Sequence, residues 1–345
     1  MRNSNGIGPM GEYAKSGTSQ IAVVRLNMRR FQLYGLTIAS EFDLLLPEGS
    51  DAAPPAVTIR RAHPEFFNDL VSAAPGGNHK SYRYKALPDG SSYLTWNELF
   101  DFLIASDGRA IVCGPRGGTV FEGFKNELLS EPYISYLISF AMSFALLRIG
   151  DETLHATVIE SGGQAIGFLG NSGAGKSTLA SYFLRRGCRL LTDDLLRVTF
   201  RGQTVMAHPG PQRIKLFPES AAEFMQRETC TVAANPFTAK LLIVPAADQR
   251  MAKGAPLRAL YLLESLEERD EINSIGVERI RSGDAALNVI ASTFNAAVKT
   301  PERLGRQLQF VRQILSKIPI FRLSYPRRFD ALASVYDLVV HGYPR

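Results

Sequence analysis

The stretch IGFLGNSGAGKSTLASYFLRRGCRLLTDD, residues 166–194, decides the fold. Within it Gly170, Gly175, Lys176 and Ser177 fit the phosphate-binding pattern of a glycine, four residues, then Gly-Lys-Ser/Thr. The apolar run 165–169 before the glycines is typical of a buried parallel strand, and the apolar spacing after Lys176 predicts a helix. A strand, a glycine loop and a helix in this order predict an α/β fold.

The residue types in the loop suit an anion. Glycines let the backbone approach phosphate oxygens closely, and the start of the following helix adds partial positive charge. Lys176 would contact the outer phosphates, and Ser177 would offer its hydroxyl to Mg²⁺. The alternative is a glycine-rich turn before an ordinary helix. The predicted nucleotide-binding residues are Gly170, Asn171, Ser172, Gly173, Ala174, Gly175, Lys176, Ser177 and Thr178.

Two adjacent carboxylates end the next predicted strand. Gly187 is suited to end the helix, and residues 188–192 then form a short apolar run that closes on Asp193 and Asp194. Ligands of α/β sheets bind beyond the carboxyl ends of strands, so both carboxylates should lie beside the glycine loop. One could hold Mg²⁺ and the other could accept a proton from an attacking hydroxyl. A polar strand end or a helix cap is the alternative.

Residues 154–194 resemble the catalytic core of the HPr kinase/phosphorylase family and of its relatives that phosphorylate lasso peptide precursors. The features that carry the resemblance are His155 after an apolar residue, the glycine loop, Arg186-Gly187-Cys188 and the pair Asp193-Asp194. The family usually has histidine where this chain has Cys188. The glutamate-containing stretch that follows the paired aspartates in HPr kinases is not recognisable, and residues 208–216 resemble the Pro-Gly segment of the lasso-type relatives instead.

The resemblance implies a chemistry and residue roles. ATP and Mg²⁺ would bind at the loop with Lys176 and Ser177 as ligands, and Asp193 would support the metal. Asp194 would accept the proton of a substrate serine, and His155 would lie in the active site as a catalytic residue alongside Asp194 and Lys176. The acceptor would be a hydroxyl of a peptide or small protein, such as a ribosomal peptide precursor. Without the resemblance, a lone histidine such as His155 is usually a hydrogen-bonded core residue.

Length and composition predict an ordinary globular protein of two parts. The chain has 345 residues, 45% of them hydrophobic and 21% charged. A net charge of +6 could suggest a nucleic-acid partner, but the sequence shows no interleaving of aromatic and basic residues that would support one. Three widely spaced cysteines predict a reduced, cytoplasmic setting, and an assembly of identical chains is left open.

The expected organisation starts with a disordered N-terminus, 1–20, because this stretch is rich in Asn, Gly and Ser and lacks an apolar core. A β-rich region, 21–130, follows, with short strands and frequent turn residues that favour antiparallel pairing. The apolar stretch 132–149 predicts a buried helix, assigned to 131–150, rather than a membrane span. The remainder, 151–345, would be a nucleotide domain of the HPr kinase type, a mixed sheet with flanking helices.

The last part of the chain offers one weak site candidate. Arg213 and Lys215 lie in the Pro-Gly segment, where one of them could steady ATP phosphates or contact an acidic peptide. A solvated strand face is the alternative, and Arg213 is kept as the candidate. Helices are predicted over 285–298, 301–317 and 329–340. Two further interpretations remain open: a kinase for a small metabolite, and a nucleotide-gated binding module that transfers little. The paired aspartates argue against the second.

Overall fold

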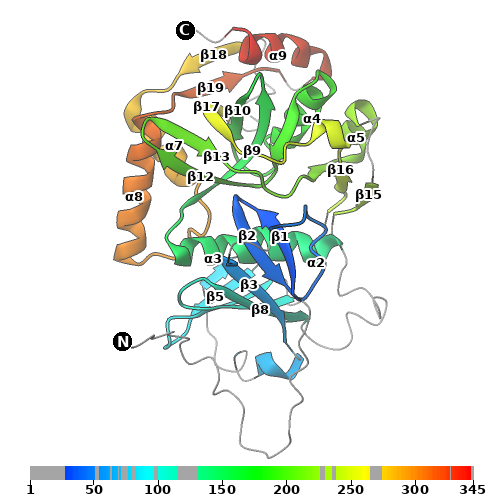
Figure 1. Cartoon of the computed structure of the whole chain (residues 1–345). Coiled ribbons are helices and arrows are strands. Elements are labelled where there is room, and N and C mark those ends of the chain that lie inside the picture. The colour runs from blue at the N-terminus through cyan, green and yellow to red at the C-terminus, as the bar shows by residue number, and fades with distance from the viewer. Residues whose placement is uncertain are drawn as a thin grey trace, which may run out of the picture.

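The computed structural model describes residues 28–50, 54–62, 64–68, 70, 77–79, 82–96, 100–115, 131–225, 230–234, 238–264, 274–326 and 328–342. The expected disordered N-terminus, 1–20, and the first residues, 21–27, of the expected β-rich region lie outside these residues. The described chain contains one sheet in its N-terminal part and two in its C-terminal part (Figure 1).

The N-terminal part is a mixed sheet of eight strands. Their order is β1 (Arg29–Leu33), β2 (Leu36–Ser40), β3 (Val57–Arg61), β8 (Ala110–Pro115), β7 (Phe100–Ile104), β6 (Ser92–Trp96), β5 (Tyr82–Ala86) and β4 (Gly77–His79). The β2–β3 and β3–β8 pairs are parallel, and the other pairs are antiparallel. The predicted β-rich N-terminal region is therefore present, with mainly antiparallel pairing.

The apolar stretch forms a helix that lies across the middle of the molecule (Figure 1). It consists of α2 (Glu131–Ser135), a π-helical segment η3 (Tyr136–Ala141) and α3 (Met142–Ile149). The helix ends at Gly150, whose φ of 110° is available to glycine without a Cβ clash. Its buried side chains, such as Leu137 and Phe144, pack in one core with those of the N-terminal sheet. No helix among the described residues is long and apolar enough to span a membrane.

The aromatic residues at this boundary include the single tryptophan of the chain. The Trp96 ring lies 4.5 Å from the Tyr136 ring, between centroids, and 5.0 Å from the Phe140 ring. The end of strand β6 is thereby packed against the π-helical segment.

The C-terminal part is built on a second mixed sheet. Its order is β10 (Gln164–Leu169), β9 (Thr153–Ser161), β12 (Leu195–Arg201), β13 (Thr204–Ala207), β17 (Ala255–Leu263), β19 (Ile320–Ser324) and β18 (Gly276–Arg279). Strand β10 also pairs with β17 in parallel, so the path closes on itself. The short β11 (Arg189–Thr192) shares the edge of β9 with β12. The predicted mixed sheet is present.

Helices cover both faces of this sheet. One apolar core includes residues of α4 (Lys176–Arg185), α5 (Pro218–Phe224) and α9 (Leu332–Val340). The core on the other face includes residues of α7 (Ser282–Ala291) and α8 (Pro301–Leu315). A small third sheet, β14 (Ile214–Leu216), β16 (Leu241–Val244) and β15 (Cys230–Ala233), adjoins α4. Single helical turns span Pro64–Phe67, Ala247–Gln249 and Phe329–Ala331.

Helix α7 is shorter than predicted, because it ends at Ala291 rather than near Val298. The Phe294 N–H donates to the Thr153 carbonyl at 3.0 Å, and Asn295 adopts a left-handed backbone with φ of 63°. The Asn295 side chain then exchanges two hydrogen bonds with Ser143 of α3. These long-range contacts override the apolar spacing that predicted a longer helix.

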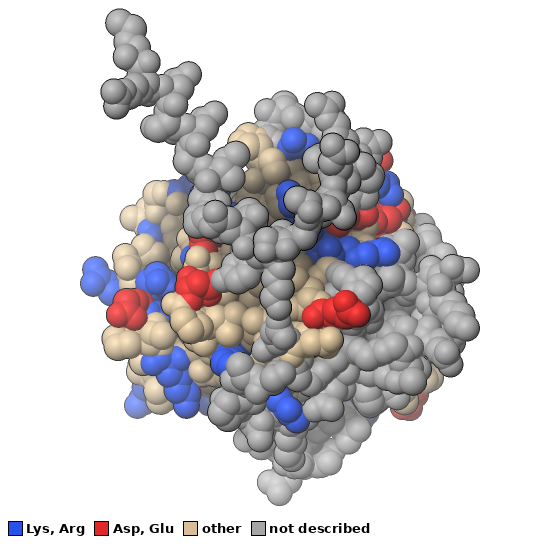
Figure 2. All heavy atoms as spheres, turned by 90° about the horizontal axis from the view of Figure 1, so that it is seen from below, with Lys and Arg blue, Asp and Glu red and all other residues tan. Residues whose placement is uncertain are grey.

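Buried hydrogen bonds connect the N-terminal part to the C-terminal part. The Arg197 guanidinium donates to the Tyr34 carbonyl at 2.8 Å, and the Tyr34 hydroxyl donates to the Ile138 carbonyl at 3.0 Å. Seen from the end of the N-terminal sheet, acidic and basic side chains are interspersed over the described surface (Figure 2). Among the residues described on this face, the basic side chains therefore do not form one continuous patch (Figure 2).

Candidate functional site

The glycine loop joins β10 to α4, as the sequence predicts. Gly170, Gly173 and Gly175 have φ of 143°, 90° and 90°, in the range that side chains disfavour. A Cβ at Gly170 would also meet the Ala174 Cβ and the Leu263 carbonyl oxygen at 3.1 Å. The loop is therefore a tight turn that requires glycine, and it leads to the N-terminus of a ten-residue helix.

Lys176, at the start of α4, is folded back on the loop. Its ammonium donates to the carbonyls of Gly170 at 2.8 Å and Asn171 at 3.1 Å, and to His155 Nε2 at 3.1 Å. All three N–H donors of the ammonium thus have acceptors within the protein. Burial lowers the pKa of Lys176, and the carboxylates of Asp193 and Asp194 oppose this shift.

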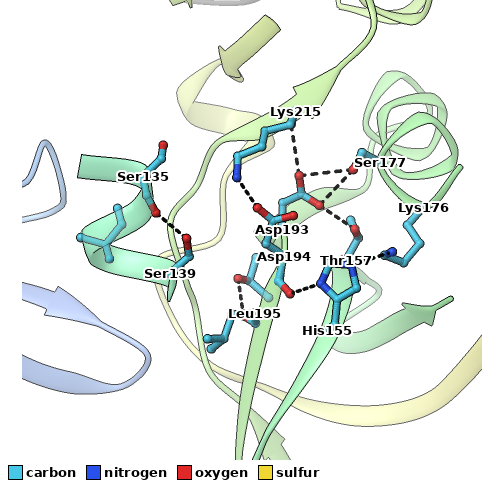
Figure 3. Close-up of polar contacts among 12 residues, drawn as sticks. Ser135, Ser139, His155, Thr157, Lys176, Ser177, Asp193, Asp194, Leu195 and Lys215 are labelled. Atoms are coloured by element: carbon cyan, nitrogen blue, oxygen red, sulfur yellow. Dashed lines mark hydrogen bonds and ion pairs between the residues drawn. The ribbon is translucent and has the colours of Figure 1, made fainter. Parts of the chain in front are cut away.

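Ser177 and Asp193 face each other across the end of β11 (Figure 3). The Ser177 hydroxyl lies 3.1 and 3.3 Å from the two carboxylate oxygens of Asp193. Asp193 also accepts from the Thr157 hydroxyl at 2.6 Å and from the Lys215 backbone N–H at 3.1 Å. Burial, and then the neighbouring Asp194 carboxylate, raise the pKa of Asp193.

Asp194 lies at the turn from β11 into β12 and has a left-handed backbone with φ of 73°. Aspartate tolerates this conformation better than most residues. Its carboxylate forms an ion pair with the Lys215 ammonium. Burial raises the pKa of Asp194, but the Lys215 ammonium, acting together with the other basic side chains near the carboxylate, including Lys176, outweighs burial and holds the pKa below its usual range.

His155 lies on β9 between the loop and the paired aspartates. Its Nδ1 lies 3.0 Å from the Asp194 carbonyl oxygen, which can accept but not donate, so Nδ1 carries the proton. Nε2 then accepts from Lys176. Burial, and then the Lys176 charge, lower the pKa of His155 to about 4. The neutral imidazole therefore connects Lys176 to the backbone of Asp194.

These donors suit a magnesium nucleotide. A hydroxyl and a carboxylate are hard oxygen ligands, and Mg²⁺ is commonly held by one or two such groups together with substrate phosphates. The Ser177 and Asp193 oxygens, already within 3.1–3.3 Å of each other, could hold the ion. The N-terminus of α4 and the Lys176 ammonium are suited to the phosphates.

The other predicted site residues lie in different surroundings. Asn171, Ser172 and Gly173 are exposed at the tip of the loop, whereas Ala174 is buried. The Thr178 hydroxyl is hydrogen-bonded to Ser220 of α5 at 3.2 Å. Arg213 is buried, and its guanidinium donates to the carbonyls of Leu44 and Leu45 at 2.9 Å. The structure thus places Arg213 in the contact between the two parts of the chain, not on a solvated strand face.

Sequence reasoning missed Thr157, and of the two basic residues in the Pro-Gly segment it kept Arg213 rather than Lys215. Thr157 lies two positions after His155 on β9, and this alternation was the available signal that both point to one face. Lys215 lies between the buried Ile214 and Leu216 on β14, which directs it away from that core. The Pro-Gly segment does supply a cation to the site, but it is Lys215 rather than Arg213.

The neutral His155 gives a test of stability against pH. An unfolded histidine titrates near 6.5, so between pH 6.5 and about 4 the unfolded chain binds more protons than the folded one. The free energy of unfolding should therefore fall as the pH drops through this window. Urea unfolding at several pH values should show that His155→Gln removes up to about 1.4 kcal/mol per pH unit of this slope. Equal slopes in the two proteins would contradict a buried neutral imidazole.

Comparisons with known proteins relate part of this chain to HPr kinases. No family model matches the chain. The HPr kinase/phosphorylase of Limosilactobacillus reuteri is 33% identical over 82 residues, 24% of this chain and 26% of that protein. The HPr kinase/phosphorylase of Chloroherpeton thalassium is 34% identical over 65 residues, 19% of each chain. The matches span about a quarter of the length of the L. reuteri protein and about a fifth of the C. thalassium protein.

Among solved structures, the Hpr(Ser) kinase/phosphatase from Coxiella burnetii matches with a TM-score of 0.30 and 12% sequence identity. The match covers 54% of this chain and 93% of that chain.

Proposed function

We propose that this protein is an ATP-dependent kinase that transfers the γ-phosphoryl group to a serine-type hydroxyl of a peptide or small protein. One observation carries the proposal: Lys176 and Ser177 at the start of α4 meet Asp193 and Asp194 at the end of β11. The local similarity to HPr kinase/phosphorylases supports the same reaction type.

The proposed reaction is an in-line displacement. The bond between the γ-phosphorus and the β,γ-bridging oxygen breaks, and its electron pair leaves with ADP. A bond forms between the acceptor oxygen and phosphorus, and the hydroxyl proton passes to the Asp194 carboxylate.

The side chains of the site would position the ATP phosphates and neutralise their negative charge. Lys176 exchanges its loop carbonyls for phosphate oxygens, and the N-terminus of α4 holds the phosphates. Ser177 and Asp193 would hold Mg²⁺, which supplies charge neutralisation at the phosphates when bound. His155 orients Asp194 through its backbone carbonyl.

The test is transfer from γ-labelled ATP with Mg²⁺ to serine-bearing peptides and to small hydroxyl metabolites. Lys176→Ala should lower kcat/KM about 10²- to 10³-fold, because it removes a charge from the transferred group. Lys317→Ala is the matched control, since Lys317 donates to the exposed turn at Gly202. Transfer that persists in Lys176→Ala would refute the role of the loop. Transfer to a metabolite alone would replace the peptide acceptor, and tight ATP binding without transfer would favour a binding module.

A further inference from the structure

Lys215 reaches the candidate site from a different sheet. It lies on β14, and its backbone N–H donates to an Asp193 carboxylate oxygen at 3.1 Å. Its ammonium pairs with Asp194 Oδ2. The Lys215 and Asp194 side chains are 25% and 29% exposed, so solvent and ligands can reach the pair.

The ammonium of Lys215 has donors to spare. Among the residues that the structure describes, Asp194 is its one hydrogen-bond acceptor, whereas a lysine ammonium carries three donors. Lys176 differs, because two carbonyls and His155 take all three of its donors. Lys215 can therefore contact a further anion without leaving Asp194, but Lys176 must release its acceptors first.

The position of Lys215 complements that of Lys176. The two lysines lie on opposite sides of the Asp193–Asp194 pair (Figure 3). A phosphoryl group that passes from the start of α4 to a hydroxyl at Asp194 would travel between them. Lys215 holds the Oδ2 atom of Asp194, and Oδ1 makes no hydrogen bond within the described part of the chain. Oδ1 is thus the oxygen that can accept the hydroxyl proton.

Stability alone does not account for the pair. Partly exposed ion pairs contribute on average about 0–1 kcal/mol to folding. The Lys215 backbone N–H is fixed by its hydrogen bond to Asp193, and the ammonium contacts Asp194. Asp194 is the carboxylate that would accept the proton of the acceptor hydroxyl in the proposed reaction. This placement favours a role in the transfer.

We propose, on the basis of the proposed function, that Lys215 is a catalytic residue that contacts the γ-phosphoryl oxygens while it holds Asp194 Oδ2. It remains protonated throughout, and the bonds that form and break are those of the displacement described above. Lys215 would bring the transferred phosphorus and the acceptor oxygen together and neutralise the charge on the phosphoryl group. The contact distinguishes ATP from ADP, because ADP lacks the γ-phosphoryl group.

The experiment compares Lys215→Ala, Lys215→Arg and Lys317→Ala with the wild type. Mg-ATP and Mg-ADP affinities are measured by calorimetry, and folding is measured by thermal unfolding. The values of kcat and KM are measured with the acceptor that the transfer experiment identifies. Lys215→Ala should bind ADP within about twofold of the wild type and ATP about tenfold more weakly, since it loses a charge-assisted hydrogen bond. Its kcat should fall about 10²-fold. Lys215→Arg should recover part of the preference for ATP over ADP. Lys317→Ala should change neither the nucleotide affinities nor kcat.

The outcomes separate this proposal from the proposed function. An unchanged ratio of ATP to ADP affinity in a folded Lys215→Ala protein would overturn the role of Lys215, whatever the transfer rate. If the wild type binds ATP but transfers to no acceptor, the kinase proposal fails, and the same ratio still decides whether Lys215 contacts the γ-phosphate. If the wild type binds neither nucleotide, both proposals are refuted.

Discussion

Asp194→Asn is expected to reduce phosphoryl transfer by up to about 10⁴-fold while leaving ATP binding nearly intact. The variant removes the proton acceptor, and general bases contribute about 10²- to 10⁴-fold to such reactions. Asparagine tolerates the left-handed backbone at this position, and the carbonyl that His155 contacts remains. A loss of activity would thus report on the carboxylate rather than on the turn.

The measurement is the single-turnover rate of transfer together with ATP affinity. Asp330→Asn is the matched control, because its side chain is 71% exposed and pairs only with the exposed Arg328 among the described ion pairs. A fall of less than tenfold in Asp194→Asn, with Asp330→Asn unchanged, would show that Asp194 is not the base.

Glu152→Ala is expected to lower the free energy of unfolding by about 3–5 kcal/mol. Glu152, just before β9, lies 3.1 Å from an Arg303 guanidinium nitrogen of α8, and the two side chains are 2% and 3% exposed. Arg303 also donates to the Phe294 carbonyl at 2.9 Å. Removal of the carboxylate leaves a buried guanidinium without its counter-charge, which costs more than the loss of the pair itself.

Equilibrium denaturation in urea checks this expectation. Asp330→Ala breaks the exposed pair with Arg328 and should change stability by less than about 1 kcal/mol. The double variant Glu152→Leu with Arg303→Met should regain much of the loss, because neither charge then remains buried. If the free energy of unfolding of Glu152→Ala lies within about 1 kcal/mol of the wild-type value, the expectation is wrong, and solvent replaces Glu152 as the partner of the Arg303 guanidinium.

The local order of the site could be predicted from the sequence. The strand 164–169, the glycine loop and α4 follow from residues that are neighbours in the chain. Asp193 lies beside Ser177 because β10 and β11 both pair antiparallel with β9 and therefore run in the same direction. A sequence pattern can express this relation, because the carboxyl ends of parallel strands meet at one edge.

Contacts between distant segments could not be predicted in the same way. The contact of Thr157 with Asp193 depends on the register between β9 and β11. The contact of Lys215 with Asp194 depends on where the small sheet that contains β14 packs beside the site. Arg213 and Lys215 lie two residues apart and look alike in the sequence. Their surroundings differ: Arg213 meets the carbonyls of Leu44 and Leu45, 168 residues or more away in the chain.

The packing of Trp96 gives this protein an optical reporter of its own. The indole lies 4.5 Å from the Tyr136 ring, and the charges of Lys215 and Asp194 influence the Tyr136 hydroxyl. Because the chain contains one tryptophan, its tryptophan fluorescence arises from this single place, where the N-terminal sheet packs against the π-helical segment η3. Nucleotide or acceptor binding that moves Lys215 should therefore change the emission of Trp96, and it can be followed in real time without an attached dye.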